Sequence, residues 1–305
     1  MDKVIKEKAY TIRGLAILAI ILCHTPTIIA NHCHADLAVS IFFFLTGYFV
    51  MNNYLNKKKY LDKNFIIRKI YNIYIPFVIS NIIYILTYII VYKHYCFNNI
   101  LDLILKIIGI IPVNGFLWYV AHVLMYYIIF YFFYHKTKNK SISFYLLTYM
   151  TYLLIVFGLC ACFRIWGGCV LFEHLLLAIG GLCAIIINKK ENIKLYSNKN
   201  KIILCILFII IFIYSLYQNN LLIIITLQVM IPFFSLIVFK YNKVLDFIGK
   251  NSLLLYIYHI QIIMVMNQYK IINNELLYIL VFLIANISII VVWEIIKRIS
   301  NKKEK

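Results

Sequence analysis

Residues 12–24 read IRGLAILAIILCH, an apolar stretch with Arg13 near its beginning and His24 at its end. In an α-helix, residues eleven positions apart are separated by three turns plus about 20°, so both side chains project from one face. The rise between them is about 16 Å, roughly half the hydrocarbon thickness of a membrane. An ionisable residue at that depth usually faces the protein interior or a cavity. The stretch therefore predicts a membrane helix with a cation at the cytoplasmic mouth of a channel and an imidazole deeper inside.

Each of the two residues has a simpler interpretation when it is taken alone. Arg13 would be a snorkelling anchor at the membrane surface, and His24 would make a hydrogen bond between helices. Their position on one face favours a functional pair, although the pair does not by itself indicate an enzyme.

The whole chain has the composition of an integral membrane protein. Of its 305 residues, 64% are hydrophobic and only 13% are charged, which leaves too little polar surface for a soluble protein. Apolar runs of membrane-spanning length recur along the chain, and we expect an all-α, polytopic bundle of about ten transmembrane helices in a single domain, residues 1–305. The predicted helices are 11–30, 37–54, 69–92, 115–134, 144–163, 170–188, 202–218, 220–239, 251–268 and 276–296. Segment 98–114 is apolar but short, and we expect it to be interfacial or re-entrant.

The basic residues indicate on which side of the membrane each loop lies. The net charge of +19 would suit a nucleic-acid partner if it formed one patch, but the basic residues recur in short loops on one side of the predicted helices. By the positive-inside rule that side, with both termini, is cytoplasmic. We therefore expect the lipid bilayer and no nucleic acid as a partner, and the sequence does not indicate an oligomeric state. The other side has only Lys93, Lys106, Arg164 and Lys270.

An arginine and a histidine separated by ten residues in the first span resemble the hallmark of the acyltransferase-3 family of membrane acyltransferases. Four further segments are similar to family motifs, in the same order along nearly the whole chain. They are SIFFFLTGYFV (40–50), with Thr46 where the family has serine; FIIRKIYNIYIPF (65–77), which leads to Pro76; GFLWYV (115–120), with Trp118; and IGKNSLLLYIYHIQI (248–262), with Tyr256 and His259.

The sequence departs from the family pattern in two places. The family often has a second arginine three or four residues after the position of Arg68, whereas this chain has Tyr71 and Asn72 there, which places a two-arginine clamp in doubt. Some members carry a C-terminal extracytoplasmic domain, and we expect none here because the sequence ends in a basic tail.

The resemblance implies transfer of an acyl group, most often acetyl from acetyl-CoA, to a carbohydrate hydroxyl. A basic cytoplasmic face would concentrate such a polyanionic donor, and arginine binds phosphate through two parallel hydrogen bonds. We therefore expect Arg13 and Arg68 to bind the acyl-CoA and His24 to act as the general base. A transient acyl-histidine is an alternative that the sequence leaves open. Acetyl-CoA would be a substrate, and no bound cofactor is expected.

Other polar residues within the predicted spans have two interpretations each. Tyr48, Asn52 and Trp118 are candidates for stabilising the oxyanion. His259 would either line the site or make a structural hydrogen bond. For His122, a structural role is favoured. Glu173 and His174 would either form an ion pair with Arg164 or line the acceptor entrance, and the ion pair is favoured. His32, Cys33 and His34 lack the spacing of metal ligands, so no metal site is expected.

These observations predict a multi-pass O-acetyltransferase of the bacterial cytoplasmic membrane. Its acceptor would be a cell-surface polysaccharide or the lipid-linked precursor of one. The alternative is a transporter or flippase for a lipid-linked sugar or polysaccharide, because a helical bundle with buried polar residues suits that function too. The Arg13–His24 pair favours the enzyme, since a flippase needs no base in line with a cytoplasmic phosphate site.

Overall fold

The computed structural model describes residues 2–27, 35–56, 61–62, 64–135, 137, 141–163, 171–189, 198–217, 221–269 and 274–303. Throughout these ranges the regular structure is helical, and they contain no strand. The helices are α1 (Asp2–Cys23), α3 (Ala35–Asn56), α4 (Phe65–Lys69), the π-helical η1 (Ile70–Tyr74), α5 (Ile75–Tyr92), α6 (Ile100–Ile107), the 3₁₀-helical η2 (Gly115–Leu117), α7 (Trp118–Tyr134), α8 (Ile142–Phe163), α9 (Leu171–Lys189), α10 (Asn198–Tyr217), α11 (Leu221–Val238), α12 (Lys243–Lys250), α13 (Ser252–Gln268) and α14 (Glu275–Lys303).

The predicted all-helical class is confirmed, and helical structure covers most of each predicted range. Four helical segments in the described ranges are long and apolar enough to cross a membrane, namely Ala35–Asn56, Phe65–Tyr92, Gly115–Tyr134 and Glu275–Trp293. The pair α12 and α13 would make a fifth span, bent by 75° at the break between them. Ten spans and two cytoplasmic termini stay predictions.

Three local features differ from the predicted helices. Helix α1 begins at Asp2, nine residues before the expected start, so the charged N-terminal segment is helical. Segment 98–114 contains the helix α6, whose 8 residues are too few to form a span of its own. Helix α12 was not expected, because its alternating charged and apolar residues do not form an apolar run.

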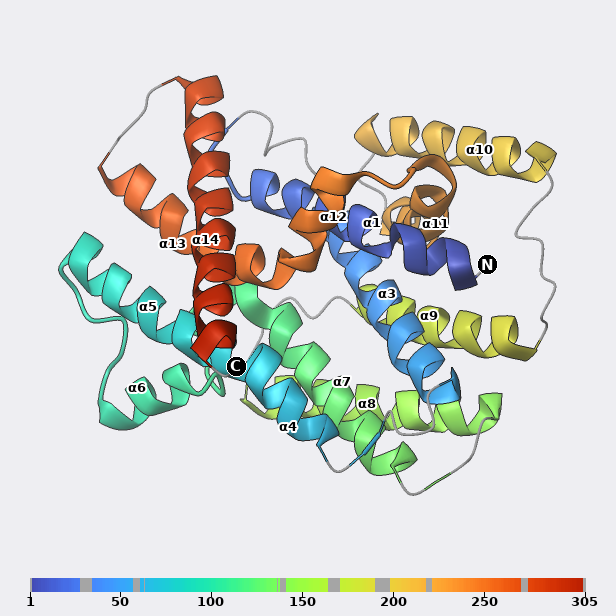
Figure 1. The fold of residues 1–305 in the computed structure, drawn as a ribbon, viewed down its shortest axis with the longest axis horizontal. Helices are drawn as coiled ribbons and strands as arrows, with labels where there is room; N and C mark the ends of the chain where they lie inside the picture. The colour runs from blue at the N-terminus through green and yellow to red at the C-terminus, as the bar shows by residue number, and fades with distance from the viewer. Residues whose placement is uncertain are drawn as a thin grey trace.

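Helix α3 lies at the centre of the bundle, beside α9 and close to α1 (Figure 1). Most of its residues are buried, as a helix that is apolar on all sides requires. The α3–α9 contact depends on two glycines. A Cβ atom at Gly47 would collide with the carbonyl oxygen of Leu177, and one at Gly180 would collide with that of Phe44. These helices therefore approach each other more closely than larger residues would permit, as in small-residue packing between membrane helices.

Helix α1 is fixed against α12 in the same manner. A Cβ atom at Gly14 would collide with the carbonyl oxygen of Leu245, and one at Gly249 with that of Tyr10. Because Gly14 directly follows Arg13, this contact fixes the rotation of α1 about its axis. The face with Arg13 consequently points toward α3 rather than toward α12.

The segment from Phe65 to Tyr92 is one helical span with a π-helical turn in it. The turn, Ile70–Tyr74, ends two residues before Pro76. Proline lacks the N–H that would bond to the carbonyl four residues earlier, and its ring crowds that carbonyl. A wider turn at this point accommodates both effects. Further along, the Ser80 hydroxyl donates a hydrogen bond of 2.9 Å to the carbonyl of Ile257, which joins α5 to α13.

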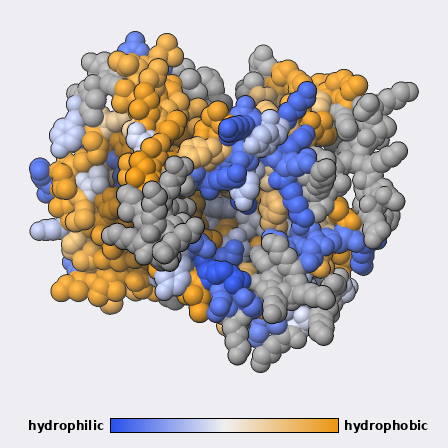
Figure 2. Space-filling view, viewed as in Figure 1, coloured by the Kyte–Doolittle hydropathy of each residue, from blue (hydrophilic) through white to orange (hydrophobic). Residues whose placement is uncertain are grey.

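Large apolar side chains cover the outer faces of several helices. Figure 2 shows an apolar surface over the part of the molecule that contains α14, and hydrophilic residues gathered toward the N-terminal part of α1. In water, so much exposed apolar surface would be unfavourable, whereas lipid covers it without cost. The most exposed of these residues include Leu86 and Ile90 on α5, Ile203 and Ile210 on α10, and Leu276 and Ile284 on α14.

Candidate active site

His24 lies directly after α1, and its ring packs against His259 of α13. The Nδ1 atom of His24 is 2.8 Å from Nε2 of His259. The two rings are nearly parallel, with centroids 5.0 Å apart. The ring of Phe116 lies on another side of His24, at a centroid distance of 4.5 Å. Residues from two other segments, α13 and η2, thus hold this imidazole in one orientation.

The hydrogen bonds around this pair assign a proton to each histidine. Nδ1 of His259 is 2.8 Å from the backbone carbonyl of Tyr256, and a carbonyl can only accept, so His259 donates from Nδ1. The Nε2 atom of a neutral His259 is then an acceptor and receives the N–H of His24 Nδ1. Nε2 of His24 keeps its lone pair, which is the form that a general base needs.

Three cavities follow α1 from its N-terminal half to His24. The basic mouth has a volume of about 490 Å³, the middle cavity about 130 Å³, and the histidine cavity about 230 Å³. Adjacent cavities share lining residues, so the three form one row. The shared residues are Arg13, Thr46 and Tyr127 between the first two, and Ile20, Val39 and Tyr256 between the last two.

The basic mouth is lined by three cations, Lys6, Arg13 and Lys69, and none of its lining residues carries a carboxylate. The Lys69 ammonium lies over the ring of Tyr127 at 3.8 Å from its centroid. The Arg13 guanidinium lies 5.7 Å from the centroid of Phe49, and its buried Nε has no hydrogen-bond partner within the described chain. The amides of Asn52, Asn53 and Asn56 complete the lining. Cations, amides and aromatic rings together suit a phosphorylated nucleotide.

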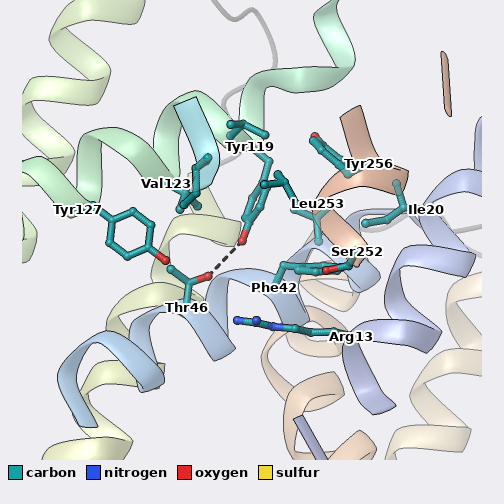
Figure 3. A pocket seen from close by; sticks show the side chains of 13 residues that line it. Arg13, Ile20, Phe42, Thr46, Tyr119, Val123, Tyr127, Ser252, Leu253 and Tyr256 are labelled. Atoms are coloured by element: carbon teal, nitrogen blue, oxygen red, sulfur yellow. Dashed lines mark hydrogen bonds between the residues drawn. The ribbon is translucent and has the colours of Figure 1, made fainter. Parts of the chain in front are cut away.

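The middle cavity is narrow and mostly apolar. Figure 3 shows Arg13 extending along one side of it, toward Thr46 of α3. The hydroxyls of Thr46 and Tyr119 are 3.1 Å apart and join α3 to α7 across the cavity. Thr46 occupies the place of the serine in the family motif. An uncharged, thin arm would fit this space better than a charged group would.

The histidine cavity contains the two carboxyl groups of the row. Asp36 and Glu173 line it together with His24, and both lie in the first turn of their helices, α3 and α9. Glu173 is 2% exposed, and its Oε2 atom has no hydrogen-bond partner in the described part of the structure. The side chain of Gln228 donates to Asp36 at 3.2 Å. The row therefore changes from cationic at the mouth to acidic beside the base.

A family model described as an acyltransferase domain, that of acyltransferase-3, matches residues 11–295. This chain belongs to the acyltransferase-3 family. The family predicted from the motifs is thereby confirmed, and the acyltransferase is a multi-pass membrane protein that uses an acyl donor and an acceptor. The matched range includes Arg13 and His24. No curated protein and no solved structure matches the chain.

The structure of this acyltransferase brings most of the predicted site residues to the row of cavities. Arg13 lies at the basic mouth and His24 in the last cavity, as the spacing predicted. Asn52 lines the mouth, Trp118 lines the histidine cavity, and His259 contacts His24 directly. Their roles in catalysis stay predictions.

Two predicted residues lie outside the row. Tyr48 is fully buried between Phe44 and Phe49 and lines none of the three cavities. Arg68 binds Asp62 instead, with 2.8 Å between the guanidinium and the carboxylate. The hydrogen bond from Arg68 lowers the pKa of the Asp62 carboxyl. Lys69, which the sequence did not single out, lines the basic mouth where Arg68 was expected. Neighbouring residues on a helix point about 100° apart, so Arg68 and Lys69 face different surroundings.

Of the other residues that the sequence singled out, some are buried within the helical bundle and some lie outside the described ranges. His122 and His174 are fully buried with ring centroids 4.9 Å apart, and His174 bonds to the Tyr152 hydroxyl at 2.8 Å. A structural role for His122 agrees with this burial. The partner expected for Glu173, Arg164, lies outside the described residues, as do His32, Cys33 and His34.

Tyr119 and Asp36 line the row but were missed by the sequence analysis. Asp36 gave no signal of its own, because it is one acidic residue near the start of an apolar run. Tyr119 directly follows the motif tryptophan, so the motif did point to this segment. Both reach the row through the packing of α3 and α7 against α1.

Proposed function

We propose that this acyltransferase takes acetyl from cytoplasmic acetyl-CoA and esterifies a hydroxyl of a cell-surface polysaccharide or its lipid-linked precursor. It would act in the bacterial cytoplasmic membrane, with the basic mouth open to the cytoplasm. One observation carries the proposal. A single row of cavities connects a cluster of cations to an imidazole that holds a free lone pair.

The basic mouth supports a nucleotide thioester as the donor. Arg13 and Lys69 would bind its phosphates, since cations with no carboxylate among them attract a polyanion. The apolar middle cavity would receive the thin arm that carries the acyl group. Arg13 on α1 and His24, directly after its last residue, are eleven positions apart, which corresponds to about 16 Å along a helix. This separation would keep the charged nucleotide at the surface while the thioester reaches His24.

His24 would act on the acceptor hydroxyl. Its Nε2 takes the hydroxyl proton as the oxygen attacks the thioester carbonyl. The tetrahedral intermediate then collapses, the carbon–sulfur bond breaks, and an ester forms. The thiolate leaves with the electron pair of that bond and takes the proton from the imidazolium, which regenerates the base. His259 would hold Nδ1 of His24 throughout, so that the reacting nitrogen is always Nε2.

The proposal is tested in cells that carry the wild type, His24→Ala or no copy of the gene, with matched membrane levels of the two proteins. The surface glycan is isolated, and its base-labile acetyl groups are measured by mass spectrometry. We expect the wild type to add acetyl groups that His24→Ala and the cells without a copy both lack.

Two results would contradict the proposal. Equal acetylation by His24→Ala and wild type would exclude His24 as the base. Unchanged acetylation in the cells without a copy, together with reduced glycan export, would favour the transporter or flippase over the enzyme.

A further inference from the structure

The histidine cavity has two carboxylic side chains next to the base. Asp36 and Glu173 line it together with His24, and carboxyl oxygens accept hydrogen bonds. A molecule that fills this cavity must therefore offer several O–H or N–H groups on one side. That requirement describes the acceptor better than it describes the donor, because a thioester has no such group at its reacting end.

Glu173 gives the strongest indication of a missing ligand. Its side chain is 2% exposed, and the Oε2 atom has no hydrogen-bond partner among the described residues. A buried polar atom without a partner is costly, so such atoms often mark the place where a ligand binds. Because Glu173 lines the cavity of His24, a hydroxyl bound there would satisfy Oε2.

The parallel arrangement of α3 and α9 places the two carboxyl groups at one end of the bundle. Gly47 and Gly180 permit the close approach of the helices. Near the other end, the Asn188 amide donates to Asn52 at 3.1 Å, which fixes the register. This register places Asp36 and Glu173 together at the cavity.

Aromatic rings form the rest of the wall. Phe116 and Trp118 line the cavity, and Phe116 also contacts His24. Flat apolar rings beside carboxyl groups suit a ligand that has C–H faces and O–H edges, which is the chemistry of a sugar ring. The negative charge that the two carboxyl groups share would repel a ring that carries its own carboxylate or phosphate.

We infer that the histidine cavity binds the acceptor as a neutral, polyhydroxylated ring. Glu173 and Asp36 accept hydrogen bonds from hydroxyls next to the one that His24 deprotonates. The inference rests on the proposed function and adds to it the residues that select the acceptor. Glu173 is thus a specificity-determining residue, and uronic acids and phosphorylated sugars are excluded from the reacting position.

The test uses purified full-length protein in lipid nanodiscs with labelled acetyl-CoA. The probes are methyl glucoside and methyl glucuronide, which differ only in the group at one carbon. Ester products are measured by mass spectrometry for the wild type and Glu173→Gln. Asp102→Asn is the matched control, because Asp102 pairs with Lys106 on α6 and lines none of the three cavities. Coenzyme A binding is measured by calorimetry for each protein.

We expect the wild type to acetylate the neutral glucoside in preference to the glucuronide. Glu173→Gln should raise the KM for the glucoside about tenfold, the usual size of one lost hydrogen bond. Its affinity for coenzyme A should match the wild type, and Asp102→Asn should match the wild type in every measurement.

Preference for the glucuronide, or an unchanged KM in Glu173→Gln, would overturn the inference. The preference of the wild type between the glycosides tests the inference even if Glu173→Gln does not fold. If the wild type transfers no label to any glycoside and releases none to water, the proposed function fails, and the acceptor site fails with it. Donor consumption by the wild type therefore separates the two failures.

Discussion

At the scale of the residue, the neighbour of His24 determines which of its two ring nitrogens carries the proton. The carbonyl of Tyr256 fixes the proton on Nδ1 of His259, and His259 in turn fixes the proton on Nδ1 of His24. Neither bond requires a charged group. The arrangement resembles the way a carboxylate orients the histidine of a catalytic triad, with a neutral imidazole in place of the carboxylate.

His259 is therefore expected to be a positioning residue. His259→Leu should lower kcat about a hundredfold, within the usual range for general-base catalysis, and leave the KM for acetyl-CoA unchanged. His259→Gln should retain more activity, because its amide oxygen still accepts from Nδ1 of His24. Steady-state kinetics of acetyl transfer by the purified variants check this. Equal kcat values for wild type and His259→Leu would show that His259 has only a structural role.

Lys69 and Arg68 are adjacent but face different surroundings. Lys69 lines the basic mouth, whereas the exposed Arg68 binds the half-buried Asp62. The lowered pKa of the Asp62 carboxyl keeps this pair intact at neutral pH, and the pair is lost only as the pH falls through that pKa. The guanidinium of Arg68 is therefore already paired with Asp62 at neutral pH.

We accordingly expect Lys69→Gln to weaken acetyl-CoA binding about tenfold, and Arg68→Gln to change it by less than about twofold. Calorimetric titration at pH 7 and low salt measures both affinities. The reverse order would restore Arg68 to the donor site that the sequence predicted for it.

At the scale of the element, glycines determine how closely the central helices pack. Gly47 and Gly180 join α3 to α9, and Gly14 and Gly249 join α1 to α12. Without these contacts, the helices that carry Arg13, Asp36 and Glu173 would not share one row of cavities. The elements thus hold the site by close backbone packing, as membrane helices do in the absence of a hydrophobic force between them.

Gly180→Ala is expected to destabilise the protein, because its Cβ would collide with the carbonyl of Phe44. The cost should be about 1–3 kcal/mol or more, as for overpacked cores. Gly158→Ala on α8 is the control, since no atom lies within 4 Å of the added Cβ. The melting temperature in detergent should fall for Gly180→Ala only. An unchanged melting temperature for that variant would show that the contact can relax.

The helices could be predicted from the sequence wherever an apolar run was long. Helix α12 could not, because its short amphipathic pattern carries no membrane signal. Within the site, the positions of Arg13 and His24 could be predicted because Arg13 lies on α1 and His24 directly follows its last residue, so that helical spacing nearly sets their directions. Glu173 reaches the same cavity only through the packing of α9 on α3, and a single sequence does not contain that information.

At the scale of the whole molecule, the row of cavities gives the protein a direction. Cations line one end and carboxyl groups the other, while apolar side chains cover the outer faces of α5, α10 and α14. A donor and an acceptor would therefore enter from opposite sides of the membrane. This arrangement requires that the basic mouth, near the N-terminal half of α1, face the cytoplasm.

Reporter fusions test that orientation. Green fluorescent protein fused after Lys305 should be fluorescent, and alkaline phosphatase fused there should be inactive, because the positive-inside rule places this end in the cytoplasm. Phosphatase inserted at the exposed Tyr95, between α5 and α6, should be active. Active phosphatase at Lys305 would reverse the predicted orientation and close the mouth to cytoplasmic acetyl-CoA.

The most direct test of the account is transfer of labelled acetyl from acetyl-CoA by the purified protein, compared between wild type, His24→Gln and His94→Gln. His94 is an exposed histidine that lines none of the three cavities and serves as the matched control. The account predicts that His24→Gln binds coenzyme A normally but transfers label at least about a hundredfold more slowly, while His94→Gln matches the wild type. Transfer by His24→Gln at the wild-type rate would contradict it, because the base would then lie elsewhere.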